Sequence, residues 1–177
     1  MLTTLTQRES ERLKVLRDYH ILDTPSEIAF ERLTSLSARI FDVPICFVSL
    51  IDADRQWFKS CFGIDIRETN RALSFCTHTI LSDEVFVVPD ATLDPRFAEN
   101  VFVTGEPYIR FYAGAPLTSP EGLKIGTLSI LDMEPRVFDA KLQHMLSDLA
   151  ASVMDDLELR RTAFRLRENE ISLRENE

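Results

Sequence analysis

Cys76 and His78 are the two residues whose types and spacing most readily suggest chemistry. A thiol and an imidazole so close in sequence could form a nucleophile with its base, two ligands of a metal ion, or an anchor for a covalent chromophore. Residues 73–81 have the pattern of a short helix, in which positions two apart point about 200° away from each other. We therefore expect no catalytic residue here. Cys76 should pack as a small apolar side chain, and His78 should hydrogen-bond to a pocket wall.

Arg110 and Tyr112 alternate along an apolar run, so their side chains should share one face of a strand. If that face lines a pocket, Arg110 could hold an anionic group of a ligand while aromatic side chains supply apolar walls. The alternative is a structural salt bridge from Arg110 to Asp90 or Asp94. The candidate ligand-binding residues are Trp57, Phe75, Cys76, His78, Asp90, Phe97, Arg110 and Tyr112.

Neither the three cysteines nor the three histidines of the chain have the spacing of metal ligands. The cysteines form an odd set without a Cys-x-x-Cys pair, which argues against a disulfide framework and a structural zinc site. Cys46 and Cys61 fall in apolar runs, where burial would leave them inert. We expect no metal site and a reducing cytoplasmic location.

The composition limits the classes of partner. The 177 residues carry a net charge of −9, which would repel the phosphates of nucleic acid. No run of 18 apolar residues is present, so we expect no membrane insertion. With 45% hydrophobic residues, the chain can build one folded core plus an additional element.

Two helices are predicted near the N-terminus. The first begins at Thr6, whose spacing to Glu9 fits a capping box. The second begins at Thr24, which is followed by proline at the first helical position. Its expected apolar stripe consists of Ala29, Leu33, Leu36 and Ile40.

Five apolar, β-rich runs predict strands, and the first two should pair as a hairpin around the turn 52–55. The continuous apolar character of the first run suits a central strand covered on both faces. The predicted strands cover residues 45–51, 56–62, 85–88, 109–117 and 124–131.

A single long helix is predicted from the N-cap Asp139 to Glu177, because this stretch contains neither glycine nor proline. It would be about 60 Å long at 1.5 Å per residue, more than one core can cover. Its far half needs a partner or solvent, and the apolar spacing approaches that of a coiled coil. The residues expected on a dimer-forming face are Leu146, Val153, Leu157, Phe164 and Ile171.

The end of this helix repeats every seven residues, since the first four residues of 167–173 recur at 174–177. Arg160 and Arg167 occupy seam positions and would weaken a dimeric coil, so a solvated helix is the alternative. We expect a linker that leads into an output domain outside this sequence. The expected divisions are an N-terminal helical arm (1–23), a core (24–138) and the long helix (139–177).

Four motifs in order resemble the GAF family, in particular the subgroup at the N-terminus of bacterial histidine kinases and diguanylate cyclases. The resemblance covers about Ser26 to Leu159. It implies an α+β (α/β) fold with an antiparallel sheet of five or six strands, helices on one face, a ligand pocket on the other, and a C-terminal signalling helix. The motifs are Phe75–Ile80, Val88–Ala91 with Asp94–Phe97, Ile109–Leu117 and Ile125–Leu128.

The resemblance also limits the cofactors. In bilin-binding relatives the anchoring cysteine is normally followed directly by histidine, whereas Thr77 intervenes here, so we expect neither bilin nor haem. The Asn-Lys-x-Phe-Asp-Glu signature of cyclic-nucleotide-binding relatives is absent from this sequence. The identity of any ligand stays open.

Three functions remain. The first is a cytoplasmic, non-catalytic sensor that binds an unidentified small molecule and signals through a parallel homodimer of its C-terminal helix. The second is a ligand-free dimerisation scaffold whose pocket is filled by its own side chains. The third is a thiol-based redox sensor or an enzyme similar to the free methionine sulfoxide reductases, which also use this fold.

Overall fold

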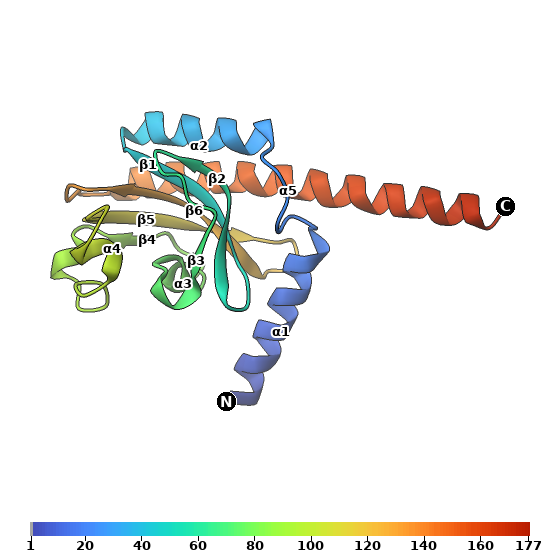
Figure 1. Cartoon of the computed structure of the whole chain (residues 1–177), viewed down its shortest axis with the longest axis horizontal. Helices are drawn as coiled ribbons and strands as arrows, with labels where there is room; N and C mark the ends of the chain where they lie inside the picture. Colours follow the sequence, from blue (N-terminus) through green and yellow to red (C-terminus); the bar gives the residue numbers. More distant parts are fainter. Residues whose placement is uncertain (1) are drawn as a thin grey trace.

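The fold is a six-stranded antiparallel sheet with two long helices, α2 (Ile28–Phe41) and α5 (Ala140–Glu175), on one face and short helices and loops on the other (Figure 1). The structure is a computed structural model that describes residues 2–177, with side chains from Thr6 onward. The strand order is β3-β2-β1-β6-β5-β4, which confirms the expected α+β class and antiparallel sheet. The strands are β1 (Ile45–Ile51), β2 (Arg55–Phe62), β3 (Glu68–Asn70), β4 (Phe86–Val88), β5 (Phe111–Thr118) and β6 (Lys124–Asp132).

The central position of β1 explains its continuous apolar sequence. Every residue of this strand is buried, because β2 and β6 flank it and both faces of the sheet are covered. All five predicted strands are present, and their ends lie within two residues of the prediction. The strand missed by the sequence, β3, is a three-residue polar edge strand whose composition resembles that of a loop.

The face of the sheet opposite the long helices is covered by short elements. The predicted helix over residues 73–81 is shorter than expected, because Ser74 is extended and separates two pieces. The side chain of Asn70 caps the first piece by accepting a hydrogen bond from Ala72 N. The two pieces are the 3₁₀ helix η1 (Arg71–Leu73) and the α-helix α3 (Cys76–Thr79). The other short elements on this face are the 3₁₀ helix η2 (Ala91–Leu93) and the α-helix α4 (Val101–Thr104).

The two N-terminal helices begin at residues other than those predicted. The first helix, α1 (Leu2–Asp18), is already helical before Thr6, and Glu9 pairs with Arg12 instead of closing a capping box. The second, α2 (Ile28–Phe41), begins four residues after Thr24. The hydroxyl of Thr24 instead donates to a carbonyl of the preceding turn and accepts a hydrogen bond from Lys59 Nζ.

The buried face of α2 differs from the predicted stripe. Leu36 and Ile40 are 45% and 42% exposed, whereas the polar residues Thr34 and Ser37 are buried. Thr34 and Ser37 can be buried because each has a partner; for example, the Thr34 hydroxyl lies 2.8 Å from Ser60 Oγ on β2. Apolar spacing alone therefore selected the wrong face.

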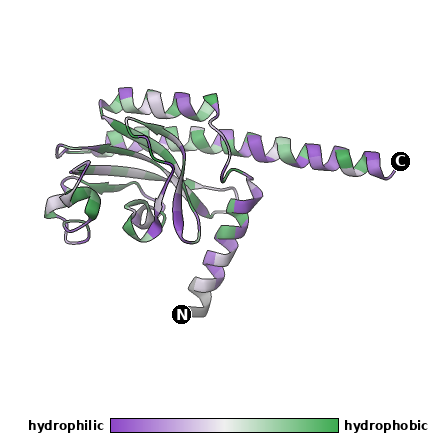
Figure 2. Ribbon diagram, viewed as in Figure 1, coloured by the Kyte–Doolittle hydropathy of each residue, from purple (hydrophilic) through white to green (hydrophobic). Residues whose placement is uncertain are grey.

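The main hydrophobic core lies between the sheet and the helices α2 and α5 (Figure 2). Its sheet residues come mainly from β1, β5 and β6, where side chains alternate between the two faces; examples are Val48, Phe111 and Leu128. The C-terminal part of α1 joins this core through Leu16 and the residues that follow it.

The long helix α5 (Ala140–Glu175) starts as predicted, since the carboxylate of its N-cap Asp139 accepts a hydrogen bond from Leu142 N at 3.0 Å. Its first half packs on the sheet and its second half projects beyond it (Figure 1). Leu146, Val153 and Leu157 are 0% exposed in the core. Their assignment to a dimer-forming face is wrong, because this side of α5 faces the chain's own sheet.

The connection between α1 and α2 is tied to α5 near the point where α5 leaves the sheet. Arg160 donates hydrogen bonds to the carbonyl oxygens of Tyr19 (3.1 Å) and His20 (2.6 Å). The ring of His20 stacks on Phe164 with 3.7 Å between centroids. Phe164, which was assigned to the dimer face, is therefore partly used within its own chain, whereas Ile171 is 54% exposed.

An ion-pair cluster fixes α1 to the start of η1. Both oxygens of Glu9 accept hydrogen bonds from Arg12 at 2.9 Å, and Arg71 Nη1 lies 2.6 Å from Glu9 Oε1. Arg12 is buried and also donates to Ile51 O. The hydrogen bond from Arg12 lowers the pKa of Glu9 to about 2, against the opposing effect of partial burial.

This pKa shift predicts an acid-dependent loss of stability. The ionised carboxylate of Glu9 should contribute fully above about pH 4.5, its ordinary pKa, and its contribution should disappear as the pH falls toward 2. In Glu9→Gln we expect a lower urea midpoint at pH 7 and a smaller fall of that midpoint between pH 5 and pH 3. Glu11→Gln, at an exposed position of the same helix, is the control. Parallel pH profiles of wild type and Glu9→Gln would contradict the assignment.

Candidate functional site

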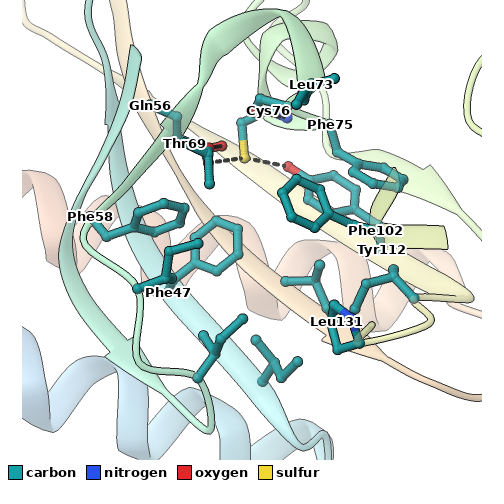
Figure 3. A pocket seen from close by; sticks show the side chains of 16 residues that line it. Phe47, Gln56, Phe58, Thr69, Leu73, Phe75, Cys76, Phe102, Tyr112 and Leu131 are labelled. Carbon is teal, nitrogen blue, oxygen red and sulfur yellow. Dashed lines mark hydrogen bonds between the residues drawn. The ribbon is translucent and has the colours of Figure 1, made fainter. Parts of the chain in front are cut away.

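A cavity lies on the face of the sheet opposite α2 and α5, between the sheet and the loops around β3 and α4 (Figure 3). Its cavity volume is about 60 Å³, and the space around it that is open to solvent brings the total to about 530 Å³. Aromatic and aliphatic side chains form most of its wall. The lining residues are Ile45, Phe47, Gln56, Phe58, Ile64, Ile66, Thr69, Leu73, Ser74, Phe75, Cys76, Phe102, Pro107, Ile109, Tyr112 and Leu131.

Cys76 forms the polar centre of this site. It is the first residue of α3, it is 1% exposed, and the hydroxyl of Ser74 fixes its backbone by accepting from Cys76 N at 2.9 Å. Polar side chains from four strands surround its sulfur atom. The distances from Cys76 Sγ are 2.9 Å to Gln56 Nε2, 3.2 Å to Tyr112 OH, 3.2 Å to Thr127 Oγ1, 3.5 Å to Ser129 Oγ and 3.8 Å to Ser49 Oγ.

These polar groups also bond to one another. Ser49 Oγ lies 3.0 Å from both Gln56 Nε2 and Thr127 Oγ1, and the Tyr112 hydroxyl lies 2.9 Å from Ser129 Oγ and 2.7 Å from Thr79 Oγ1. The cluster is therefore internally satisfied, as buried polar groups must be. Burial, followed by the proximity of Cys76, raises the pKa of Tyr112 well above its usual value, so this phenol keeps its proton.

An aromatic layer lies behind one wall of the cavity. Phe75 stacks between Tyr112 and Phe97, with centroid distances of 5.2 and 4.2 Å. The ring of His78 meets the ring of Phe97 edge-on at 5.0 Å. Burial, with Arg96 nearby, lowers the pKa of His78, which favours a neutral imidazole that acts as a flat packing element.

The structure thus brings three of the eight candidate residues, Phe75, Cys76 and Tyr112, to the cavity wall. Phe97 and His78 form the layer behind it. His78 was expected to hydrogen-bond to a pocket wall, and its described contacts are with aromatic rings instead.

The other three candidates serve the fold. Trp57 is 4% exposed in the core on the helix side of the sheet, because it alternates with its cavity-lining neighbours on β2. Asp90 caps η2 by accepting from Thr92 N at 3.0 Å. Arg110 lies outside the cavity lining and donates to Val103 O (2.9 Å) and Ile109 O (3.1 Å). Among the described ion pairs, the alternative salt bridge to Asp90 or Asp94 is not formed, and Asp94 pairs with Arg96.

Several residues of the site were missed, and strand alternation could have found some of them. Gln56 and Phe58 flank Trp57 on β2 and therefore point to the opposite face from it. Phe47 and Ser49 alternate in the same way on β1. Hydroxyl residues inside otherwise apolar strands were a second signal, since a buried hydroxyl needs a partner.

The remaining two cysteines are unsuited to nucleophilic chemistry. Burial raises the pKa of Cys46 above its usual value and that of Cys61 to about 12, so both thiols stay protonated at neutral pH.

Among the described residues, no group of three or more His, Cys, Asp or Glu side chains is placed to hold a metal ion. Within residues 2–177, no helix combines the length and apolar character of a membrane span.

Comparison with known proteins identifies the family. The sequence model of the GAF domain family matches residues 25–155 of this chain. This chain belongs to the GAF family. Its sheet, the cavity on one face and the long C-terminal helix are the features of a GAF domain, a regulatory module of signalling proteins, as the resemblance of the motifs had indicated.

A relative in sequence is a cyclic di-GMP phosphodiesterase from Pseudomonas aeruginosa, which is 46% identical over 128 residues. The match covers 72% of this chain and 22% of that protein, so the chain spans about a fifth of its relative.

Solved structures share the fold at low identity. One is the free methionine-R-sulfoxide reductase of Neisseria meningitidis, solved with its substrate. It matches with a TM-score of 0.64 at 17% identity, and the match covers 88% of this chain and 93% of the reductase chain. The GAF domain of an Acinetobacter phosphoenolpyruvate-protein phosphotransferase has a TM-score of 0.63 at 14% identity, over 89% and 97% of the two chains.

Proposed function

We propose that this GAF domain is a cytoplasmic sensory module that binds a neutral small molecule in the cavity around Cys76 and reports its presence through α5. The observation that carries the proposal is the cavity itself, which has an apolar wall and, at one end, the cluster of polar side chains around Cys76. This is the usual character of small-molecule sites. None of the 16 described residues that line it is Asp, Glu, Lys, Arg or His, which favours a ligand without net charge.

The sheet offers a short route from the cavity to α5. Tyr112 of β5 and Ser129 of β6 belong to the polar cluster. Their neighbours Phe111 and Ile130 point to the other face and belong to the core that includes α5. A ligand that displaces the polar cluster would therefore act on the strands that support the helix. Transmission requires two states with different affinity for the ligand.

The output of the module is the second part of the proposal. The projecting half of α5 carries Leu159, Leu166 and Leu173 at intervals of seven residues, exposed by 70%, 64% and 69%. This spacing favours a parallel homodimer through a coiled coil. We propose that the helix leads to an output domain, of the histidine kinase or diguanylate cyclase kind suggested by the motifs. The Pseudomonas relative adds cyclic di-GMP hydrolysis as a candidate output.

The ligand-free scaffold remains a second candidate. It is supported by the polar cluster, whose members satisfy one another without a ligand. A module of this kind would use the cavity only as part of its packing, and α5 would provide the whole function.

Native mass spectrometry, compared with the denatured mass, tests the sensory proposal. We expect a reproducible non-covalent adduct on the protein as purified, and its loss in Leu73→Trp, because Leu73 lies at the cavity wall and is 38% exposed. Leu93→Trp is the matched control, since Leu93 also ends a 3₁₀ helix, is 81% exposed and lies outside the cavity. An adduct kept by Leu73→Trp would place the ligand elsewhere, and a clean apo protein would favour the scaffold.

A further inference from the structure

The amide of Gln56, at the polar end of the cavity, has used both of its donors but retains an acceptor. Both N–H groups of Gln56 are engaged, at 3.0 Å from Ser49 Oγ and 2.9 Å from Cys76 Sγ. Its carbonyl oxygen accepts only one hydrogen bond among the described residues, from Thr69 Oγ1 at 3.3 Å. A carbonyl oxygen has two lone pairs, so Gln56 Oε1 can accept one more hydrogen bond.

The other polar groups in the lining differ from Gln56. Ser74 Oγ accepts from Cys76 N at 2.9 Å, and among the described hydrogen bonds its own O–H has no acceptor, so Ser74 adds a donor beside the acceptor of Gln56. The hydroxyl of Tyr112 lies within 3.2 Å of Thr79, Ser129 and Cys76, and these neighbours occupy its donor and acceptor positions. Gln56 is 3% exposed and belongs to the lining of the cavity, so a ligand held there lies beside its side chain.

Aromatic rings line two sides of the cavity. Figure 3 shows Phe47 and Phe58 on one side of the cavity, with Phe75, Phe102 and Tyr112 on the other. The Phe47 and Phe58 rings meet edge-on at 4.9 Å, and the Phe75 and Tyr112 rings stack at 5.2 Å. Aromatic rings favour such offset and edge-to-face contacts with a further aromatic group.

We infer that the ligand is a neutral aromatic molecule that donates one N–H or O–H hydrogen bond to Gln56 Oε1 from an edge of its ring. This inference rests on the proposed sensory function and specifies the ligand class of the same cavity. A carboxylate on the ligand would be buried without a cationic partner, so anionic aromatic molecules are excluded from the class.

Isothermal titration with matched probes tests the inference on the full chain. Indole has one ring N–H, and benzofuran has nearly the same shape without a donor. We expect indole to bind about tenfold more tightly than benzofuran, the effect of one hydrogen bond of about 1.4 kcal/mol. Indole-3-carboxylate should bind more weakly than indole, because its charge would be desolvated.

Two variants separate the possible outcomes. In Gln56→Met, which keeps the length of the side chain, we expect the preference for indole over benzofuran to fall to about one, while Gln7→Met, on an exposed part of α1, keeps it. Equal binding of both probes by the wild type, with loss of both in Leu73→Trp, would overturn the donor inference and leave the sensory proposal standing. Absence of binding by every probe would overturn the inference. In that case the sensory proposal would still be supported if native mass spectrometry shows an adduct that the wild type and Leu93→Trp keep and Leu73→Trp loses.

Discussion

Leu157→Ala is expected to lower the free energy of unfolding by about 2–5 kcal/mol, which is the range for truncating a fully buried leucine. Leu157 is 0% exposed in the core between α5 and the sheet. The truncation removes apolar contacts, and a side chain held among rigid strands leaves a cavity that the neighbours fill only in part. Urea unfolding at several protein concentrations measures the loss and separates it from dimer dissociation.

Leu166→Ala is the matched variant on the same helix. Leu166 is 64% exposed on the projecting half, so the stability of the core should change by less than about 0.5 kcal/mol. If the leucines seven residues apart form a seam between two copies, Leu166→Ala should weaken the dimer in sedimentation experiments. An equal loss of unfolding free energy in Leu166→Ala and Leu157→Ala would contradict the description of α5 as a buried first half and an exposed, projecting second half.

The contrast between these two leucines shows why the sequence predicted the helix but not its faces. The N-cap at Asp139 and the absence of Gly and Pro determine where α5 begins and that it is long. Which apolar residues face the sheet depends on how the helix is rotated against strands far away in sequence. Both sets of apolar residues recur with nearly helical spacing, so periodicity could not separate Leu157 from Leu166.

The same limit applies to α2. Its buried face includes Thr34 and Ser37, whose hydroxyls have partners in the folded chain. One partner of Thr34 is Ser60, on a strand 26 residues later. Polar residues with distant partners look like solvent-facing residues in the sequence, which is why the stripe through Leu36 was chosen instead.

The candidate site was predicted in part. Its residues in sequence motifs were found, whereas its polar cluster depends on contacts between distant strands. Phe75, Cys76 and Tyr112 lie in motifs, and alternation on β5 correctly placed Tyr112 opposite Phe111. Alternation could have placed single members of the polar cluster on the cavity face, but not their meeting around Cys76, because the cluster joins residues from four strands and α3 that only the sheet order brings together.

Gly126→Ala is the second substitution expected to have a large effect, at about 3 kcal/mol or more of lost stability. Gly126 lies opposite Leu50 where the two central strands pair. A Cβ atom at this position would lie 2.0 Å from Ser49 O and 3.1 Å from Leu50 Cα. Both contacts are with backbone atoms, so no change of side-chain rotamer can relieve them, and β1 and β6 would have to move apart.

Gly122→Ala provides the control for a glycine that is needed for its conformation alone. Gly122 has a φ of 81°, and an added Cβ would meet nothing within 4 Å. Its cost should be limited to the left-handed backbone, about 1–2 kcal/mol. Thermal and urea unfolding of the two variants give the comparison, and equal losses would argue against a tight approach of β1 and β6.

The position of Gly126 also links this stability effect to the site. Ser49, whose carbonyl oxygen would be displaced, contributes its side chain to the cluster through Gln56 and Thr127, at 3.0 Å each. We therefore expect a folded fraction of Gly126→Ala to bind indole more weakly than Gly122→Ala does, because the amide of Gln56 would lose its fixed orientation. Unchanged indole affinity in Gly126→Ala would mean that Gln56 is positioned without the pairing of the central strands.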